Sequence, residues 1–202
     1  MAERLPKLYL ARHGETAWSL SGQHTSFTDM PLTERGEENA RQLAARLKGV
    51  EFARVFTSPL IRARRTCELA GYGAVAVVDP DLVEWGYGDY EGRRTIDIRG
   101  ERPGWRLFRD GCPNGESFDA VRDRADRVIA RLRAVAGDTL VFAHSHFLRI
   151  LAARWLGLPV ADARLLVLAT ASISVLGYEH ALDEPALLMW NDNLLRRPPV
   201  KE

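Results

Sequence analysis

The sequence is poor in the features that mark secreted or membrane-bound chains. It has two cysteines in 202 residues, Cys67 and Cys112, which do not suggest a disulfide framework. No apolar run approaches the length of a membrane-spanning helix. The polar stretch 1–7 is followed by four apolar residues before Arg12, fewer than the core of a signal peptide needs. We therefore expect a cytoplasmic protein that does not associate with a membrane.

Neither sign of charge dominates the chain. The 28 Lys and Arg residues almost balance the 27 Asp and Glu residues, which leaves a formal net charge of +1. This balance provides no general attraction for nucleic acid, so a preference for anions has to be local. The common nucleotide and metal signatures, Gly-x-x-x-x-Gly-Lys-Ser/Thr, Gly-x-Gly-x-x-Gly and His-Glu-x-x-His, are missing. His144 and His146 have the spacing of a ligand pair, but without a third ligand we expect no metal.

The apolar pattern is that of one domain covering residues 1–202. Hydrophobic residues make up 46% of the chain and charged residues 27%, as in ordinary globular proteins. Strands are predicted over 7–12, 54–58, 75–78 and 138–144, and helices over 34–48, 59–71, 118–135 and 146–156. The remainder is expected to form loops at 19–31 and 79–92, two short helical pieces between 93 and 110, β-like runs between 165 and 190, and a mobile tail at 196–202. This alternation favours an α/β fold, a three-layer α/β/α sandwich with a mostly parallel sheet.

Three of the predicted strands end in polar side chains that suit an anionic ligand. The first strand ends at Arg12 and His13. The second is followed by a helix that carries Arg62 in its first turn, and the strand at 138–144 ends at His144. Parallel neighbouring strands would bring these side chains to one edge, where α/β proteins bind ligands. Helix N-termini and the planar fork of arginine suit a phosphate dianion there.

Each of these residues also has an ordinary structural interpretation. A single histidine after a strand is more often a hydrogen-bonded structural residue than a nucleophile. The run Arg62-Ala63-Arg64-Arg65 is typical of a solvated helix face, and helical spacing points at most one of its arginines inward. On these residues alone, a plain anion-binding site remains an alternative to a catalytic one.

Catalysis requires a proton donor in addition to an anion site. Glu84 is the best candidate by context, because it lies in an acidic and aromatic loop that Gly86, Gly88 and Gly92 break. A nearby phosphate charge would disfavour a second negative charge on this carboxyl group. Glu84 could then protonate a leaving oxygen near neutral pH.

Short motifs along almost the whole chain occur in an order that resembles one protein family. They are Arg12-His13-Gly14-Glu15-Thr16, Asp29-Met30-Pro31-Leu32-Thr33 with Gly36, Ser58-Pro59-Leu60 with Arg62-Ala63 and Thr66, Glu84, Tyr87-Gly88, Glu91-Gly92, Gly115-Glu116-Ser117 and Ala143-His144. Each piece alone is weak, but the ordered set, which spans residues 7–190, is highly specific. It resembles the histidine phosphatase superfamily, in its phosphoglycerate-mutase-like branch.

The resemblance implies a phosphohistidine mechanism that requires no metal or other cofactor. His13 would attack phosphorus through one ring nitrogen, while the other nitrogen donates its proton to a neighbouring acceptor. Arg12, Arg62 and His144 would hold the transferring group and its developing charge. Glu84 would protonate the departing alcohol and then activate the water that cleaves phosphohistidine.

The resemblance also implies a set of substrate-binding or phosphate-binding positions, namely Ser19, Thr25, Ser26, Tyr87 and Ser145. Three of them depart from the family pattern. Ser19 is shorter than the usual asparagine, and Ser26 adds a side chain where the mutases have glycine. Ser145 replaces the glycine that usually follows the second histidine, so a direct backbone approach to phosphate is not expected there.

The resemblance leaves more than one activity open. Only 59 residues lie between Glu84 and His144, which is short for a mutase of this branch. This favours an open site and a phosphatase acting on small phosphomonoesters. Phosphoglycerate mutase is the first alternative, and a catalytically silent phospho-ligand binder is the second. Segments 18–25, 83–92 and 109–116 look most like the sugar-bisphosphatase and acid-phosphatase members, so a small sugar phosphate or bisphosphate is the expected partner, with a homo-oligomer left open.

Overall fold

One six-stranded sheet forms the centre of the computed structural model, which describes residues 4–193. Its strands are β1 (Leu8–Arg12), β2 (Arg54–Thr57), β3 (Ala76–Val78), β4 (Thr139–Ala143), β5 (Ile173–Tyr178) and β6 (Pro185–Asp192). They lie in the order β3-β2-β4-β1-β5-β6. The first four in this order are parallel, whereas β5 is antiparallel to both β1 and β6. The expected mostly parallel sheet is confirmed, with β5 as the reversed strand. The tail at 196–202 lies outside the described residues.

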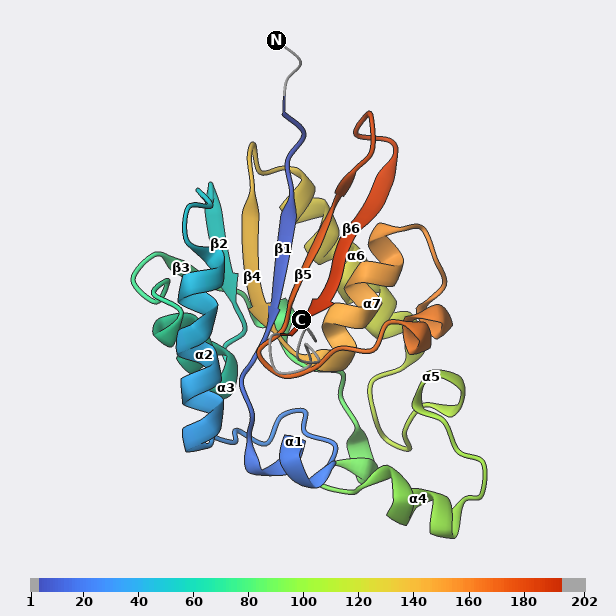
Figure 1. Ribbon diagram of the computed structural model, residues 1–202. Coiled ribbons are helices and arrows are strands. Elements are labelled where there is room, and N and C mark those ends of the chain that lie inside the picture. Colours follow the sequence, from blue (N-terminus) through green and yellow to red (C-terminus); the bar gives the residue numbers. More distant parts are fainter. Residues whose placement is uncertain (1–3, 194–202) are drawn as a thin grey trace, which may run out of the picture.

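Long helices cover both faces of this sheet (Figure 1). They are α2 (Glu34–Leu47) and α3 (Ile61–Leu69) on one face, and α6 (Phe118–Arg133) and α7 (Ser145–Trp155) on the other. Alternating side chains of β4 supply the two cores: Leu140 and Phe142 pack with the α2–α3 side, whereas Val141 and Ala143 pack with the α6–α7 side. The β4 sequence is therefore apolar at every position because both of its faces are buried.

Short elements lie beyond the carboxyl ends of the parallel strands. Figure 1 shows α1 (Ala17–Ser21) and α4 (Thr95–Glu101) below the sheet, with α5 (Leu107–Asp110) beside the lower end of α7. Short 3-10 helices also lie among these segments, namely η1 (Pro80–Leu82), η2 (Gly88–Tyr90) and the longer η3 (Val160–Leu165). The functional residues predicted from the sequence lie where these segments meet the strand ends.

Two local predictions are wrong at this end of the molecule. The segment 19–31 is not a loop throughout, because α1 extends to Ser21. A capping box starts that helix: Thr16 Oγ1 accepts from Ser19 N at 3.1 Å, and Ser19 Oγ accepts from Thr16 N at 2.9 Å. Pro59 precedes the cap of α3 instead of occupying its first turn, since α3 begins at Ile61.

The turn that follows β1 is fixed by close backbone contact with α2. A Cβ atom on Gly14 would lie 2.4 Å from the carbonyl oxygen of Gly36, and one on Gly36 would lie 2.1 Å from that of Glu15. Only glycine permits this approach. Thr33, the N-cap of α2, donates its backbone N–H to the Glu15 oxygen at 2.9 Å. The residues on either side of His13 are thereby held against the helix layer.

No helix within residues 4–193 is long and apolar enough to cross a membrane.

Candidate active site

Strands β2, β4 and β1 are adjacent and parallel, so their carboxyl ends open at one edge of the sheet. His13 continues β1 by donating its backbone N–H to Ala143 O at 3.0 Å. His144 directly follows β4, and Ser58 directly follows β2. The convergence of three strand ends that the sequence predicts is confirmed, and it brings the rings of His13 and His144 to a centroid distance of 5.2 Å.

His13 is arranged so that one ring nitrogen is free of its proton. Its Nδ1 lies 2.7 Å from the carbonyl oxygen of Gly14. A carbonyl oxygen can only accept, so Nδ1 carries the proton and Nε2 keeps its lone pair. Burial, followed by the positive charges of Arg62 and Arg12, holds the pKa of His13 well below 6.5. The ring is therefore neutral at physiological pH, as a nucleophile must be.

Arg12 supplies positive charge beside this ring. Its Nη1 donates to Leu168 O at 2.6 Å, which anchors the guanidinium. Its Nε is buried and has no hydrogen-bond partner within residues 4–193. Burial lowers the pKa of Arg12, although guanidinium remains charged in proteins. An anionic oxygen placed beside His13 would offset the cost of this unpaired donor.

Arg62 and His144 form a buried network that the sequence reasoning does not anticipate. Arg62 Nε donates to His144 Nδ1 at 3.1 Å, so His144 carries its proton on Nε2, which lies 2.8 Å from Ser58 Oγ. The two terminal nitrogens of Arg62 donate to the backbone oxygens of Thr25, Ser26 and Thr28. In this arrangement both ring nitrogens of His144 have protein partners, and Arg62 fixes the loop at 25–28.

Glu84 is bound at the N-terminus of α7. Its Oε1 accepts from Phe147 N at 2.7 Å and from Trp85 N at 3.0 Å, and its Oε2 accepts from His146 N at 3.0 Å. These backbone donors and the helix dipole orient the carboxyl group. The side chain is buried, with a relative exposure of 3%. The carboxyl group of the predicted proton donor is thus held in one position against the first turn of α7.

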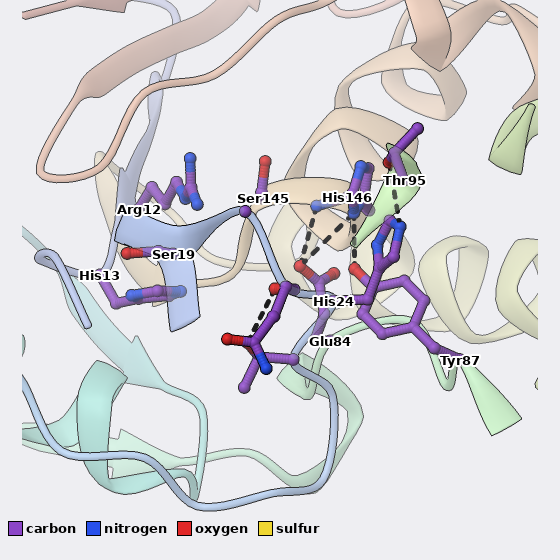
Figure 2. Close-up of a pocket in the computed structure, with 12 residues that line it drawn as sticks. Arg12, His13, Ser19, His24, Glu84, Tyr87, Thr95, Ser145 and His146 are labelled. Atoms are coloured by element: carbon purple, nitrogen blue, oxygen red, sulfur yellow. Dashed lines mark hydrogen bonds and ion pairs between the residues drawn. The ribbon is translucent and has the colours of Figure 1, made fainter. Parts of the chain in front are cut away.

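A cavity of about 250 Å³ connects these groups (Figure 2). Figure 2 shows Arg12 and His13 on one side of it, Glu84 in the middle, and His24 with His146 on the other side. Seven of the residues predicted for the site line the cavity, namely Arg12, His13, Ser19, Thr25, Glu84, Tyr87 and Ser145. The other three predicted residues do not line the cavity but contact residues that do: Arg62 contacts Thr25, Ser26 contacts Tyr87, and His144 contacts His13.

Ser26 is turned away from the cavity by a carboxylate. Both the backbone N–H and the side-chain hydroxyl of Ser26 donate to Glu91, which also accepts from Thr28 N at 3.2 Å. The side chain that replaces the family's glycine is therefore accommodated by a hydrogen bond to Glu91. Ser19 lines the cavity while its hydroxyl donates to Thr16 O within the α1 capping box. Whether these positions bind substrate stays a prediction.

Several residues of the site are missed by the sequence reasoning. His24 and His146 line the cavity, and the Tyr87 hydroxyl lies 2.5 Å from His146 Nδ1. Burial raises the pKa of Tyr87 well above 10, so the hydroxyl keeps its proton and forms a hydrogen bond with His146 Nδ1. Arg124 fixes the Glu84 loop by donating to the backbone oxygens of Val83 and Glu84. A charged residue inside the apolar stripe of α6 was the available signal for Arg124.

The histidines of the site are neutral for a shared reason. Burial is the main cause that lowers the pKa of His13, His144 and His146 well below 6.5, and neighbouring arginines lower it further. Burial also lowers the pKa of His24 to about 4. Within residues 4–193, no group of three or more His, Cys, Asp or Glu side chains is arranged to hold a metal ion. The arrangement therefore offers a neutral nucleophile, fixed cationic groups and one carboxyl group.

Residues 8–193 match the family model of the histidine phosphatase superfamily (branch 1). The chain belongs to this superfamily. It is 41% identical to an acid phosphatase of Mycobacterium tuberculosis over 93% of this chain and 94% of that protein. It is 40% identical to sedoheptulose 1,7-bisphosphatase of Saccharomyces cerevisiae over 79% of this chain and 71% of that protein. A Photorhabdus laumondii protein that carries the name "Probable phosphoglycerate mutase GpmB" is 36% identical, over 87% of this chain and 86% of that protein.

A solved structure of a Mycobacterium tuberculosis protein has the same fold. It superposes with a TM-score of 0.85 and 40% identity, over 93% of this chain and 98% of that one. The α/β architecture predicted from the sequence is thus confirmed both by the sheet and by this likeness. Family membership and the phosphatase relatives make this chain a phosphoric monoester hydrolase of the histidine phosphatase type.

The free energy of unfolding is expected to decrease as the pH falls from 7 to 5. The folded-state pKa of four histidines is lowered, in His24 to about 4, whereas unfolded histidines titrate near 6.5. Between these values the unfolded chain binds more protons, so stability is lost as the pH falls through about 6.5. Each such histidine contributes up to about 1.4 kcal/mol per pH unit. Urea unfolding at a series of pH values measures this slope.

The variant His24→Gln measures how much one of these histidines contributes to the pH dependence of stability. Because its pKa is about 4 in the folded chain, removing His24 should make the slope between pH 5 and 6 shallower by up to about 1.4 kcal/mol per pH unit. A wild-type stability that stays flat or increases between pH 7 and 5 would contradict the neutral, buried state of these rings.

Proposed function

We propose that the protein hydrolyses small phosphomonoesters, chiefly sugar phosphates or bisphosphates, through a phosphohistidine intermediate on His13 and without a metal ion. The lone pair of Nε2 forms a bond to phosphorus as the bond from phosphorus to the leaving oxygen breaks. Glu84, protonated in the substrate complex, transfers its proton to that oxygen. Water then attacks the phosphohistidine, Glu84 takes a proton from the water, and inorganic phosphate leaves with His13 restored to its starting form.

The observation that carries this proposal is the hydrogen bond from His13 Nδ1 to the carbonyl oxygen of Gly14. It selects the tautomer in which Nε2 is the nucleophile, and it donates electron density as that nitrogen becomes bonded to phosphorus. Because the pKa of His13 is depressed, its ring is already neutral at neutral pH, and the nucleophile needs no separate base. A histidine that only bound anions would serve better as a charged imidazolium.

The cationic groups beside His13 suit a phosphoryl group in transfer. Arg12 lines the cavity and has a buried Nε–H without a partner within residues 4–193. Arg62 and His144 lie next to the nucleophile, and we infer that a bound phosphate exchanges some of their present partners for its own oxygens. Such donors stabilise charge that develops on the equatorial oxygens of the transition state.

The role of Glu84 rests on its position. The carboxyl group lines the cavity between His13 and the far wall formed by His24 and His146. A substrate whose phosphorus lies at His13 would present its leaving oxygen toward this middle part of the cavity. From this position the carboxyl group can deliver a proton to the leaving oxygen.

The choice of substrate class rests on the sequence similarity to a named relative and on the volume of the cavity. One relative acts on a sugar bisphosphate by its name, and it is 40% identical. The cavity volume of about 250 Å³ fits a compact molecule. These features favour small phosphorylated metabolites over phosphoproteins or nucleic acids.

The variant Glu84→Gln is expected to lose activity in a way that depends on the leaving group. An alcohol leaving group needs a proton, so kcat for a sugar phosphate should fall by about 10²- to 10⁴-fold. Turnover of p-nitrophenyl phosphate should fall less, because p-nitrophenolate leaves without protonation. Steady-state kinetics with both substrates measures the difference.

Two further variants serve as the inactive and the unaffected controls for this comparison. His13→Ala should abolish turnover of both substrates, and the exposed Glu38→Gln on α2 should change neither. Equal losses on the sugar phosphate and on p-nitrophenyl phosphate in Glu84→Gln would remove Glu84 from the role of leaving-group acid. An active His13→Ala protein would contradict the proposed function itself.

A mutase remains the second candidate, because the relative named GpmB matches most of the chain. Incubation with 3-phosphoglycerate and a bisphosphoglycerate primer separates the two activities. We expect release of free phosphate without formation of 2-phosphoglycerate, because the site is open and admits water. Isomer formation without phosphate release would favour the mutase.

A further inference from the structure

A second cavity, of about 480 Å³, adjoins the one that contains His13. Five arginines line it, namely Arg99, Arg106, Arg109, Arg149 and Arg164, and we call it the arginine pocket. They come from α4, α5, α7 and η3, which are separate segments of the chain. No aspartate or glutamate is among the described residues that line this pocket. In a protein of net charge +1, such a local excess of positive charge marks a site for an anion.

The pocket lies against the active-site cavity and shares part of its lining. His24, Thr95 and His146 line both cavities. Figure 2 shows these three residues on the side of the active-site cavity that lies opposite Arg12 and His13. A molecule whose phosphate lies at His13 and whose other end passes Glu84 would therefore point toward the arginine pocket. We propose that this pocket binds a second anionic group, a phosphate or a carboxylate, of the same substrate. The inference rests on the proposed function and names its substrate class.

Three of the pocket arginines have no carboxylate partner within residues 4–193. The side chain of Arg106 makes no hydrogen bond there, and that of Arg99 donates only to Trp105 O at 2.9 Å. The other two have acidic neighbours: Arg109 binds Asp110 at 2.9 Å, and Arg164 lies 3.9 Å from Asp162. The pocket therefore contains three guanidinium groups, those of Arg99, Arg106 and Arg149, that no carboxylate of residues 4–193 pairs.

Arg149 is the most strongly positioned of these side chains. Its Nε donates to Ala163 O at 3.0 Å, its Nη2 donates to Arg164 O at 3.1 Å, and its guanidinium stacks over the Phe108 ring at 4.6 Å. These contacts fix the plane of the guanidinium before any ligand arrives. Arg149 forms no ion pair with a carboxylate of residues 4–193, and burial lowers its pKa to about 10. The negative charge of Glu84 acts to raise this pKa but forms no ion pair with Arg149, so an anionic ligand would offset the cost of the half-buried guanidinium.

The junction between the cavities suits the carbon skeleton of such a substrate. His146 is neutral there, and its Nδ1 forms a hydrogen bond with the Tyr87 hydroxyl. Trp105, Leu107 and Phe108 give the pocket an apolar wall beneath the arginines. A sugar chain can pack on these side chains while its two anionic ends bind at Arg12 and at Arg149.

The test compares substrates that differ in the second anionic group. For a second phosphate the pair is fructose 1,6-bisphosphate and fructose 6-phosphate, and for a carboxylate it is 6-phosphogluconate and glucose 6-phosphate. The ratio of kcat/KM within a pair is the readout. We expect a ratio above about tenfold for at least one pair, since a charge-assisted hydrogen bond is worth roughly this factor. The pair with the higher ratio identifies phosphate or carboxylate as the group bound.

The double variant Arg99→Gln with Arg106→Gln removes two exposed guanidinium groups from the pocket. The ratio should fall by about tenfold or more in this variant. Arg149→Gln should lower it as well, and the double variant keeps the test valid if Arg149→Gln does not fold. The matched control is Arg122→Gln, which removes an exposed arginine of α6 and should leave the ratio unchanged.

The outcomes separate this inference from the proposed function. A wild-type protein that hydrolyses p-nitrophenyl phosphate but shows ratios near one overturns the arginine pocket and leaves the proposed function standing. A high ratio that the double variant does not reduce also overturns the arginine pocket. A protein that hydrolyses none of these substrates, p-nitrophenyl phosphate included, contradicts the proposed function and with it the inference.

Discussion

The hydrogen bond between His13 Nδ1 and the Gly14 carbonyl is the interaction on which the chemistry of this site depends. This hydrogen bond joins two residues that are adjacent in the chain, but its geometry depends on contacts with distant parts of the fold. Strand β1 directs His13 to the sheet edge, and the contact between Gly14 and Gly36 fixes the carbonyl that accepts the proton. Gly14 N in turn donates to Thr66 Oγ1 on α3 at 2.9 Å. One sheet and two helices therefore cooperate to leave a single nitrogen lone pair in the cavity.

Electrostatics arranges the rest of the site around that nitrogen. Burial and the neighbouring arginines keep the histidines neutral, whereas the arginines remain charged because a guanidinium group is not deprotonated in proteins. Glu84 is the carboxyl group of the cavity lining, and backbone N–H groups of α7 hold it instead of an arginine. The positive charge of Arg12 and Arg62 is thus available to a ligand. The same logic applies to the arginine pocket, where Arg149 is fixed by carbonyl groups and not by a carboxylate.

The sequence predicts the sheet and the positions of its polar strand ends because both follow from local patterns. An apolar run that ends in Arg12-His13 or in His144 is visible without a structure, and so is the glycine-broken loop around Glu84. The directions of side chains in loops are not visible in this way. Ser26 turns to Glu91, and Arg62 binds the carbonyl groups of the loop at 25–28, through contacts between segments about 35 to 65 residues apart. The arginine pocket escapes prediction for the same reason, since its side chains come from four separate elements.

The central claim, that Nε2 of His13 is the phosphoryl acceptor, can be measured directly. The enzyme is mixed with a phosphorus-32 labelled sugar phosphate, quenched in alkali during turnover, and digested, and the two phosphohistidine isomers are separated. The hydrogen bond from Nδ1 to Gly14 predicts an acid-labile label on His13 with phosphorus attached to Nε2. Label on Nδ1 of His13, label on another residue, or turnover with no labelled enzyme would contradict the account.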